Sequence, residues 1–109
     1  LFVTLNKSDK DFSPSTQYND YLINEHYFHW QSQNTDSHQN NGGQRYTKQA
    51  DTQNKIILFV REEKKDGYGN TCPFHCFGLV EYMSSHDDFP MNITWKLQQP
   101  AMAQYVKAI

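Results

Sequence analysis

Residues Glu25–Asn34 read EHYFHWQSQN, and their side chains alternate between two kinds. One side of this segment carries Phe28, Trp30 and Ser32. The other side carries a more polar set, namely Tyr27, His29, Gln31 and Gln33. Period-two alternation with aromatic residues predicts a β-strand with one face on a core. The amides and rings of the opposite face are typical of a surface that binds bases or peptides. The alternative is that they are ordinary side chains of an exposed strand with no binding role.

The clearest hairpin lies in the second half of the chain. Lys55–Glu62 (KIILFVRE) is apolar on both faces through its middle, which predicts a strand buried on both sides. Lys64–Asn70 contains an Asp-Gly pair and a further glycine, which is the turn chemistry of a hairpin. The return strand is predicted over Pro73–Met83, where Gly78 indicates a bulge or a bend.

The remaining segments complete the predicted fold. Leu1–Asn6 predicts a first strand, Met91–Gln98 alternates as a last strand, and Pro100 opens a short C-terminal helix. We expect Thr35–Gln44 to be a mobile loop, because its composition provides no side chains for a core. The sequence does not define the secondary structure of Gln44–Asn54, where Tyr46 is expected to close a strand. The predicted fold class is therefore mainly β, a small curled sheet or β-barrel of five or six strands with a short C-terminal helix.

Composition limits the class of protein. A chain of 109 residues predicts a single domain, 1–109, and we interpret its start without methionine as a fragment of a longer protein. Aromatic residues make up 15% of the chain and hydrophobic residues only 37%, so the core must rely on its rings. The net charge of −2 means that any DNA contact requires a local basic patch. No apolar run approaches the roughly 18 residues that cross a bilayer, so we expect a cytoplasmic protein with no membrane partner.

The cysteines and histidines do not match a standard metal site. Four soft ligands occur in one region: Cys72, His75, Cys76 and His86. A structural zinc site brings two closely spaced pairs together on knuckles. Here the first cysteine pair runs into a strand and the last histidine lies beyond it, so we expect neither a metal nor another cofactor.

Motifs for nucleophilic catalysis are also missing. The chain has no Gly-x-Ser-x-Gly elbow and no His-Glu-x-x-His helix. His86-Asp87-Asp88 and the pair His26 and His29 are local groupings with no third partner that the sequence can name. We therefore expect no catalytic residue and no enzyme activity in this chain, and a metal-dependent nuclease is the third and weakest hypothesis.

The segment 18–21, YNDY, places two rings on either side of a carboxylate. Tyr18 and Tyr21 could sandwich a base by stacking, while Asp20 accepts a hydrogen bond from the exocyclic amine of cytosine. Gln31 and Gln33 would fill the gap left in the base stack or touch a base edge. The alternative is a turn that Asp20 caps, with both tyrosines half-buried.

Two cations stand out as candidates for phosphate contacts. Arg45 and Lys48 follow the pair Gly42-Gly43, and they would reach DNA if that loop lies on it. Lys64 and Lys65, near the predicted hairpin tip, are expected only to be solvated.

Five blocks of the sequence occur in the same order as in one bacterial domain family. They are FVTLNK at 2–7, FHWQSQ at 28–33, LFVRE at 58–62, FG at 77–78 with Tyr82, and PM at 90–91 with Ile93 and Trp95. Nearly the whole chain resembles a domain of unknown function at the C-terminus of superfamily 2 helicases, many of which carry a phospholipase-D-type nuclease. Cys72 and Cys76 are not part of that pattern.

The resemblance implies a place in a DNA-processing or restriction machine. Some relatives resemble type IV restriction enzymes that cut DNA carrying modified cytosine, and their C-terminal domain resembles an SRA (or PUA-like) β-barrel that flips a methylated base. We therefore expect an accessory domain that binds double-stranded DNA and recognises modified cytosine by base flipping. The alternative is a structural module that docks on the helicase or nuclease domains of the same chain without contacting DNA.

Overall fold

The computed structural model describes residues 1–6 and 19–109. Within these ranges the chain forms six strands and three short helices. The strands are β1 (Phe2–Asn6), β2 (Tyr21–Leu22), β3 (Tyr27–Gln31), β4 (Ile56–Glu63), β5 (His75–His86) and β6 (Asn92–Leu97). The helices are α1 (Asn41–Thr47), α2 (Gln49–Thr52) and α3 (Ala103–Val106). None of these helices is long and apolar enough to cross a membrane.

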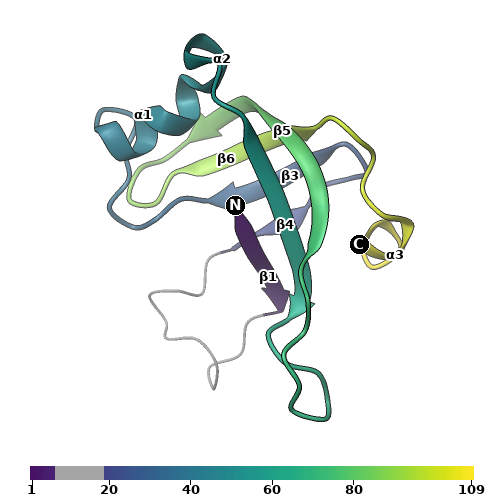
Figure 1. Ribbon diagram of the computed structural model, residues 1–109. Helices are drawn as coiled ribbons and strands as arrows, with labels where there is room; N and C mark the ends of the chain where they lie inside the picture. The colour runs from purple at the N-terminus through teal and green to yellow at the C-terminus, as the bar shows by residue number, and fades with distance from the viewer. Residues whose placement is uncertain (7–18) are drawn as a thin grey trace.

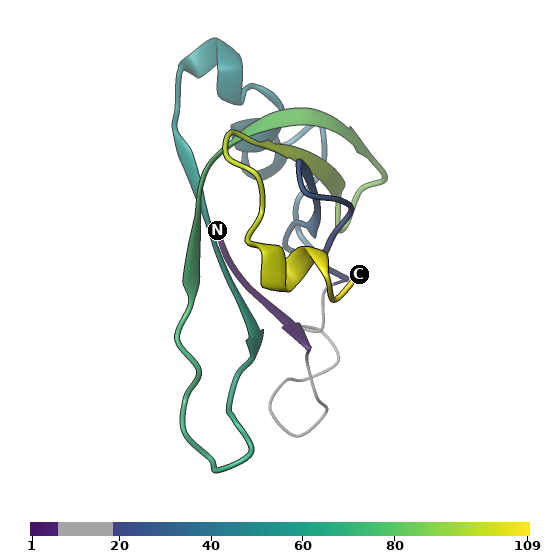
Figure 2. The same ribbon diagram turned by 90° about the vertical axis from the view of Figure 1, so that its right-hand side faces the viewer.

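All six strands belong to one sheet that curls into a nearly closed barrel (Figure 1). The spatial order is β1-β4-β5-β6-β3-β2, so β1 and β2 are its two edges. Only β1 and β4 pair in parallel, whereas every other neighbouring pair is antiparallel. In both ribbon views α1 and α2 lie at one end of the barrel, and the β4–β5 hairpin projects beyond the other end (Figure 2). The predicted mainly β, barrel-like fold with a short C-terminal helix is confirmed.

The central strand has the predicted arrangement of faces. Phe28 and Ser32 are fully buried and Trp30 is half-buried, while the polar side of β3 faces outwards between β2 and β6. Ser32 also fixes the start of β6, because its hydroxyl accepts a hydrogen bond of 2.9 Å from the Met91 backbone N–H. One residue of the outer face, His29, is only 7% exposed, since its neighbours cover it.

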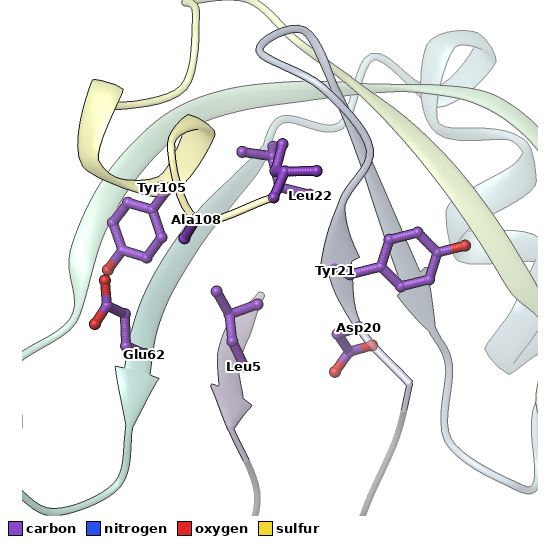
Figure 3. A pocket seen from close by; sticks show the side chains of 8 residues that line it. Leu5, Asp20, Tyr21, Leu22, Glu62, Tyr105 and Ala108 are labelled. Carbon is purple, nitrogen blue, oxygen red and sulfur yellow. The ribbon is translucent and has the colours of Figure 1, made fainter.

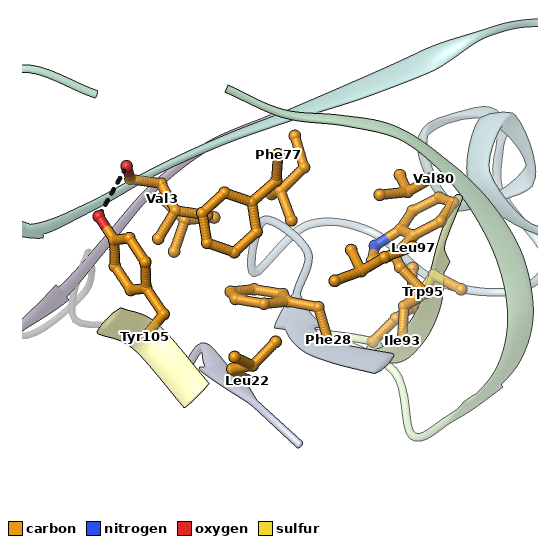
Figure 4. Packing of buried hydrophobic residues seen from close by; sticks show 12 residues of the cluster. Val3, Leu22, Phe28, Phe77, Val80, Ile93, Trp95, Leu97 and Tyr105 are labelled. Carbon is orange, nitrogen blue, oxygen red and sulfur yellow. Dashed lines mark hydrogen bonds between the residues drawn. The ribbon is translucent and has the colours of Figure 1, made fainter. Parts of the chain in front are cut away.

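The buried core contains four aromatic and eight aliphatic or methionine side chains, so it relies less on rings than the composition suggests (Figure 4). At one end of the barrel, the fully buried Trp95 lies with its ring centroid about 6 Å from the rings of Trp30, Tyr46 and Tyr82. At the other end, Tyr105 of α3 enters the barrel, and its hydroxyl donates to the Val60 carbonyl at 3.3 Å. The same hydroxyl lies 2.8 Å from Nδ1 of His75. Each end of the barrel is thus closed by a tyrosine from a helix.

The predicted strands are found close to their expected bounds. The hairpin tip is held by Asp66, whose Oδ1 accepts from the backbone N–H groups of Tyr68 (2.8 Å) and Asn70 (3.0 Å). These bonds also lower the pKa of the Asp66 carboxyl.

Gly78 has φ +83° and lies opposite the register shift between Leu58 and Phe59, which confirms the predicted bulge. The expectation that β4 is buried on both faces is wrong, because Ile57 is 42% exposed on the outer side.

The region 35–54 differs from the expected loop and strand end. Asp36 and Ser37 are buried, and Asn40 caps α1 by accepting the Gly43 N–H on Oδ1 at 2.9 Å. Tyr46 therefore lies on a helix instead of closing a strand, and its ring meets Trp30 at 5.0 Å. Glycine is needed in this first turn because a Cβ on Gly43 would fall 1.8 Å from the Ser37 carbonyl oxygen.

We expect Gly43→Ala to destabilise the domain by about 2 kcal/mol, since the added methyl group overpacks a contact with backbone. Urea unfolding followed by tryptophan fluorescence measures the free energy of unfolding. Gly67→Ala is the matched control: a Cβ at Gly67 meets nothing within 4 Å, and we expect a change of no more than about 0.5 kcal/mol. Equal stability of the two variants would contradict the close packing at Gly43.

Candidate functional site

The polar side of the central strand is a connected hydrogen-bonded surface. We call Asn19, Tyr21, His29, Gln31 and Asn92 the outer polar face. The Gln31 amide bridges two neighbours, because its Oε1 accepts the Asn19 backbone N–H at 2.6 Å and its Nε2 donates to Asn92 Oδ1 at 3.1 Å. Nδ1 of His29 lies 2.9 Å from the Asn19 carbonyl oxygen, and Nε2 of His29 lies 3.1 Å from Asn92 Oδ1.

The directions of these bonds place a hydrogen-bond acceptor beside each ring nitrogen of His29. The Asn19 N–H can only donate, so the Gln31 atom beside it must be the oxygen and the other Gln31 atom must be the donor. That donor requires an oxygen on Asn92, whose own amide nitrogen donates to Asp87 Oδ2 at 3.0 Å. Both nitrogens of His29 therefore face acceptors. The Tyr21 ring stacks on His29 at 4.5 Å with 15° between the planes.

A pocket of about 430 Å³ opens between the two edge strands, beside the outer polar face (Figure 3). Its lining is mostly apolar with two carboxylates: Leu5, Asp20, Tyr21, Leu22, Glu62, Tyr105, Ala108 and Ile109. Burial raises the pKa of the Tyr105 hydroxyl, and the nearby Glu62 carboxylate adds to this effect, so the phenol stays neutral. Apolar walls with two carboxylates suit a flat neutral or amine-bearing group and disfavour a phosphate.

Asp20 is held at the wall of this pocket by the central strand. It is 9% exposed, and its Oδ1 accepts the Gln31 backbone N–H at 2.9 Å. The Tyr21 ring points away from the pocket and towards the outer polar face (Figure 3). The two neighbouring residues thus serve adjacent surfaces, the carboxylate at the pocket and the ring outside it.

A family model described as "Domain of unknown function (DUF3427)" matches residues 1–108. The chain belongs to this family. No curated protein and no solved structure matches the chain significantly.

The structure of this DUF3427 domain brings together three of the residues predicted to bind a base. Asp20 accepts the Gln31 backbone N–H, whereas the Tyr21 ring stacks on His29, the residue two places before Gln31 on β3. Gln33 is exposed just beyond β3, and Tyr18 lies outside the described residues.

The two predicted phosphate ligands lie elsewhere. Arg45 is exposed on α1, with Cζ 5.5 Å from the Tyr46 ring centroid, and Lys48 is exposed at the C-terminal cap of α1. They share one end of the DUF3427 barrel, and neither lines the pocket. A ligand that occupies the pocket and also contacts Arg45 and Lys48 must extend from the pocket to α1.

Two groups of side chains in the DUF3427 domain were not predicted from the sequence. The first is an outward-facing set of rings on β1, β4 and the approach to β5, consisting of Phe2, Phe59 and Phe74. The second joins His38 to Asp88 and Ser85, which lie 50 and 47 residues away along the chain. The sequence had grouped Asp88 with its neighbour His86, and no local pattern indicates a partner so distant.

The cysteines of the DUF3427 domain are free thiols, Cys72 half-buried and Cys76 exposed. Among residues 1–6 and 19–109, no cluster of three or more histidine, cysteine, aspartate or glutamate side chains could hold a metal ion.

Proposed function

We propose that this DUF3427 domain is a DNA-binding accessory domain of a larger helicase-nuclease, and that it recognises modified cytosine in double-stranded DNA by base flipping. The observation that carries the proposal is the position of Asp20, on the wall of a pocket large enough for a base and directly beside an exposed polar face. The resemblance to C-terminal domains of helicases and to SRA-like readers agrees with this assignment.

The pocket supplies the groups that a flipped cytosine requires. A carboxylate is the natural acceptor for the exocyclic amine of cytosine. The hydrogen bond from the Gln31 backbone N–H fixes the Asp20 carboxylate before a base binds. Binding therefore costs little additional side-chain entropy at Asp20. Leu5, Leu22 and Tyr105 provide apolar walls for the ring and for a substituent at C5. The carboxylates of Asp20 and Glu62 repel the DNA backbone, which restricts entry to the base.

The outer polar face would contact the duplex around the flipped base. One face of the Tyr21 ring stacks on the His29 ring, yet 46% of Tyr21 remains exposed, so the Tyr21 ring can stack on a neighbouring base. Gln31 is fixed by its amide bonds, whereas Gln33 is exposed and available to a base edge. Arg45 and Lys48 would hold phosphates along the strand that leads to α1.

We expect the domain to bind duplexes with 5-methylcytosine or 5-hydroxymethylcytosine more tightly than the unmodified duplex. Asp20→Asn keeps an acceptor for the Gln31 N–H but presents an amide donor to the cytosine amine. It should weaken binding of the modified duplex about 10-fold or more, because one base contact contributes about 1–3 kcal/mol. Fluorescence anisotropy at low and moderate salt measures the affinity.

Tyr68→Ala is the matched control, since Tyr68 is 93% exposed at the tip of the β4–β5 hairpin and should not change affinity. Replacing Arg45 and Lys48 together with alanine should weaken binding to every duplex alike and reduce the salt dependence. Unchanged affinity in both Asp20→Asn and Tyr21→Ala would rule out the pocket as the binding site.

The second candidate function is a module that docks on the helicase or nuclease domains of the same chain. The observation that favours it is the outward-facing aromatic patch. Phe2 is 71% exposed; its ring stacks on Phe59 at 5.0 Å and meets the edge of Phe74 at 5.3 Å. The guanidinium of Arg61 lies over the Phe74 ring at 4.3 Å. An exposed apolar patch of this kind is typical of a protein interface.

Phe2→Ser separates the two functions. If the patch only docks, this variant of the isolated domain keeps full DNA affinity, while in the parent protein it loosens the domain and speeds limited proteolysis between domains. Tyr68→Ser is the control for a lost exposed ring elsewhere. Weaker DNA binding by Phe2→Ser, with normal thermal stability, would contradict the docking assignment and extend the DNA surface to β1.

A further inference from the structure

A chain of three hydrogen bonds links the loop before α1 to the end of β5. His38 Nδ1 lies 2.8 Å from Asp88 Oδ1, and His38 Nε2 lies 2.6 Å from Ser85 Oγ. Ser85 Oγ in turn lies 2.6 Å from the Tyr82 hydroxyl. The order carboxylate, imidazole, serine is that of the triad in serine hydrolases.

The donors and acceptors of this chain have only one consistent arrangement when the imidazole is neutral. Asp88 Oδ1 also accepts the His38 backbone N–H at 2.7 Å, and this bond, together with the bond from the ring, lowers the pKa of the Asp88 carboxyl. The carboxylate can only accept, so the proton of the neutral ring sits on Nδ1. Nε2 must then accept from the Ser85 hydroxyl, and Tyr82 must donate to Ser85 Oγ.

We propose that Ser85 is an activated nucleophile that accepts acyl groups from carboxylic esters. His38 has the unprotonated Nε2 that a general base needs, within hydrogen-bond reach of the hydroxyl it would deprotonate. Asp88 holds the ring in the required tautomer and stabilises the imidazolium that forms. The site is partly open to solvent, since the side chains of His38 and Asp88 are 35% and 42% exposed.

The reaction balances within these residues and water. Ser85 Oγ bonds to the ester carbonyl carbon as its proton passes to His38 Nε2, and Tyr82 can shift its hydrogen bond to the carbonyl oxygen that becomes negative. The C–O bond to the leaving alkoxide then breaks, and His38 returns the proton to that oxygen. Water, deprotonated in turn by His38, releases the acyl group as a carboxylic acid and restores Ser85.

The test uses a fluorophosphonate probe, in which the Ser85 oxygen bonds to phosphorus, fluoride leaves and His38 takes the serine proton. Peptide mass spectrometry gives the labelling rate at each serine. Ser84 is the internal control, because it is exposed on the same strand, whereas within residues 1–6 and 19–109 His38 forms its hydrogen bond with Ser85. A positioned general base contributes about 10²–10⁴-fold, so Ser85 should react about 100 times faster than Ser84.

His38→Gln supplies the decisive comparison, since glutamine can still bond to its neighbours but is no base. It should bring the rate at Ser85 down to that at Ser84, while thermal unfolding confirms that the variant is folded. Asp88→Asn should slow labelling at Ser85 without changing the rate at Ser84. Labelling of Ser85 no faster than Ser84, or an unchanged Ser85 rate in folded His38→Gln, overturns the proposal. Neither outcome depends on DNA binding.

Discussion

The pairing of β3 with β6 is the constraint on which the rest of this structure depends. Trp30 lies opposite Ile93 on the inner side of the pair, and Gln31 lies opposite Asn92 on the outer side. A shift of one residue would expose the rings and bury the amides. The same register therefore holds the aromatic core together and creates the outer polar face. It also places the Gln31 N–H where it fixes Asp20 beside the pocket.

The fold could be predicted from sequence wherever burial follows a simple period. Met91, Ile93, Trp95 and Leu97 alternate with polar residues in the sequence and are all buried in the structure. In contrast to the C-terminal helix, α1 and α2 were missed. The signal for α1 is local chemistry: the capping Asn40, and Gly43, which suggests a flexible loop but is required by a close contact with the Ser37 backbone. Propensity alone does not reveal such a contact.

Only part of the candidate site could be predicted from the sequence. Asp20, Tyr21 and Gln31 were chosen for their chemistry. Their positions beside one another depend on the pairing of β2 with β3, which a two-residue strand hardly signals. The surroundings of His29 depend on four hydrogen bonds that join three segments of the chain, so they follow only from the assembled structure. The contact of His38 with Ser85 is a consequence of how the loop before α1 folds across the barrel end.

Charge and apolar surface are distributed unevenly over the domain. The pocket is lined by carboxylates and apolar groups, the exposed cations Arg45 and Lys48 lie at the end with α1, and the rings of Phe2, Phe59 and Phe74 occupy the outer side of β1 and β4. A base in the pocket with its strand running towards α1 would use the first two surfaces and leave the third for another domain. Under the proposed function, this arrangement would let one domain contact DNA and a neighbouring domain at the same time.

The most direct test of base flipping uses a duplex with 2-aminopurine next to 5-methylcytosine. The fluorescence of 2-aminopurine rises when its neighbour leaves the stack. Our account predicts a several-fold rise at saturating domain with the unsubstituted protein and little rise with Asp20→Asn at equal saturation. Saturated binding of the unsubstituted domain with no change in fluorescence would contradict it, because the cytosine would then remain stacked in the duplex.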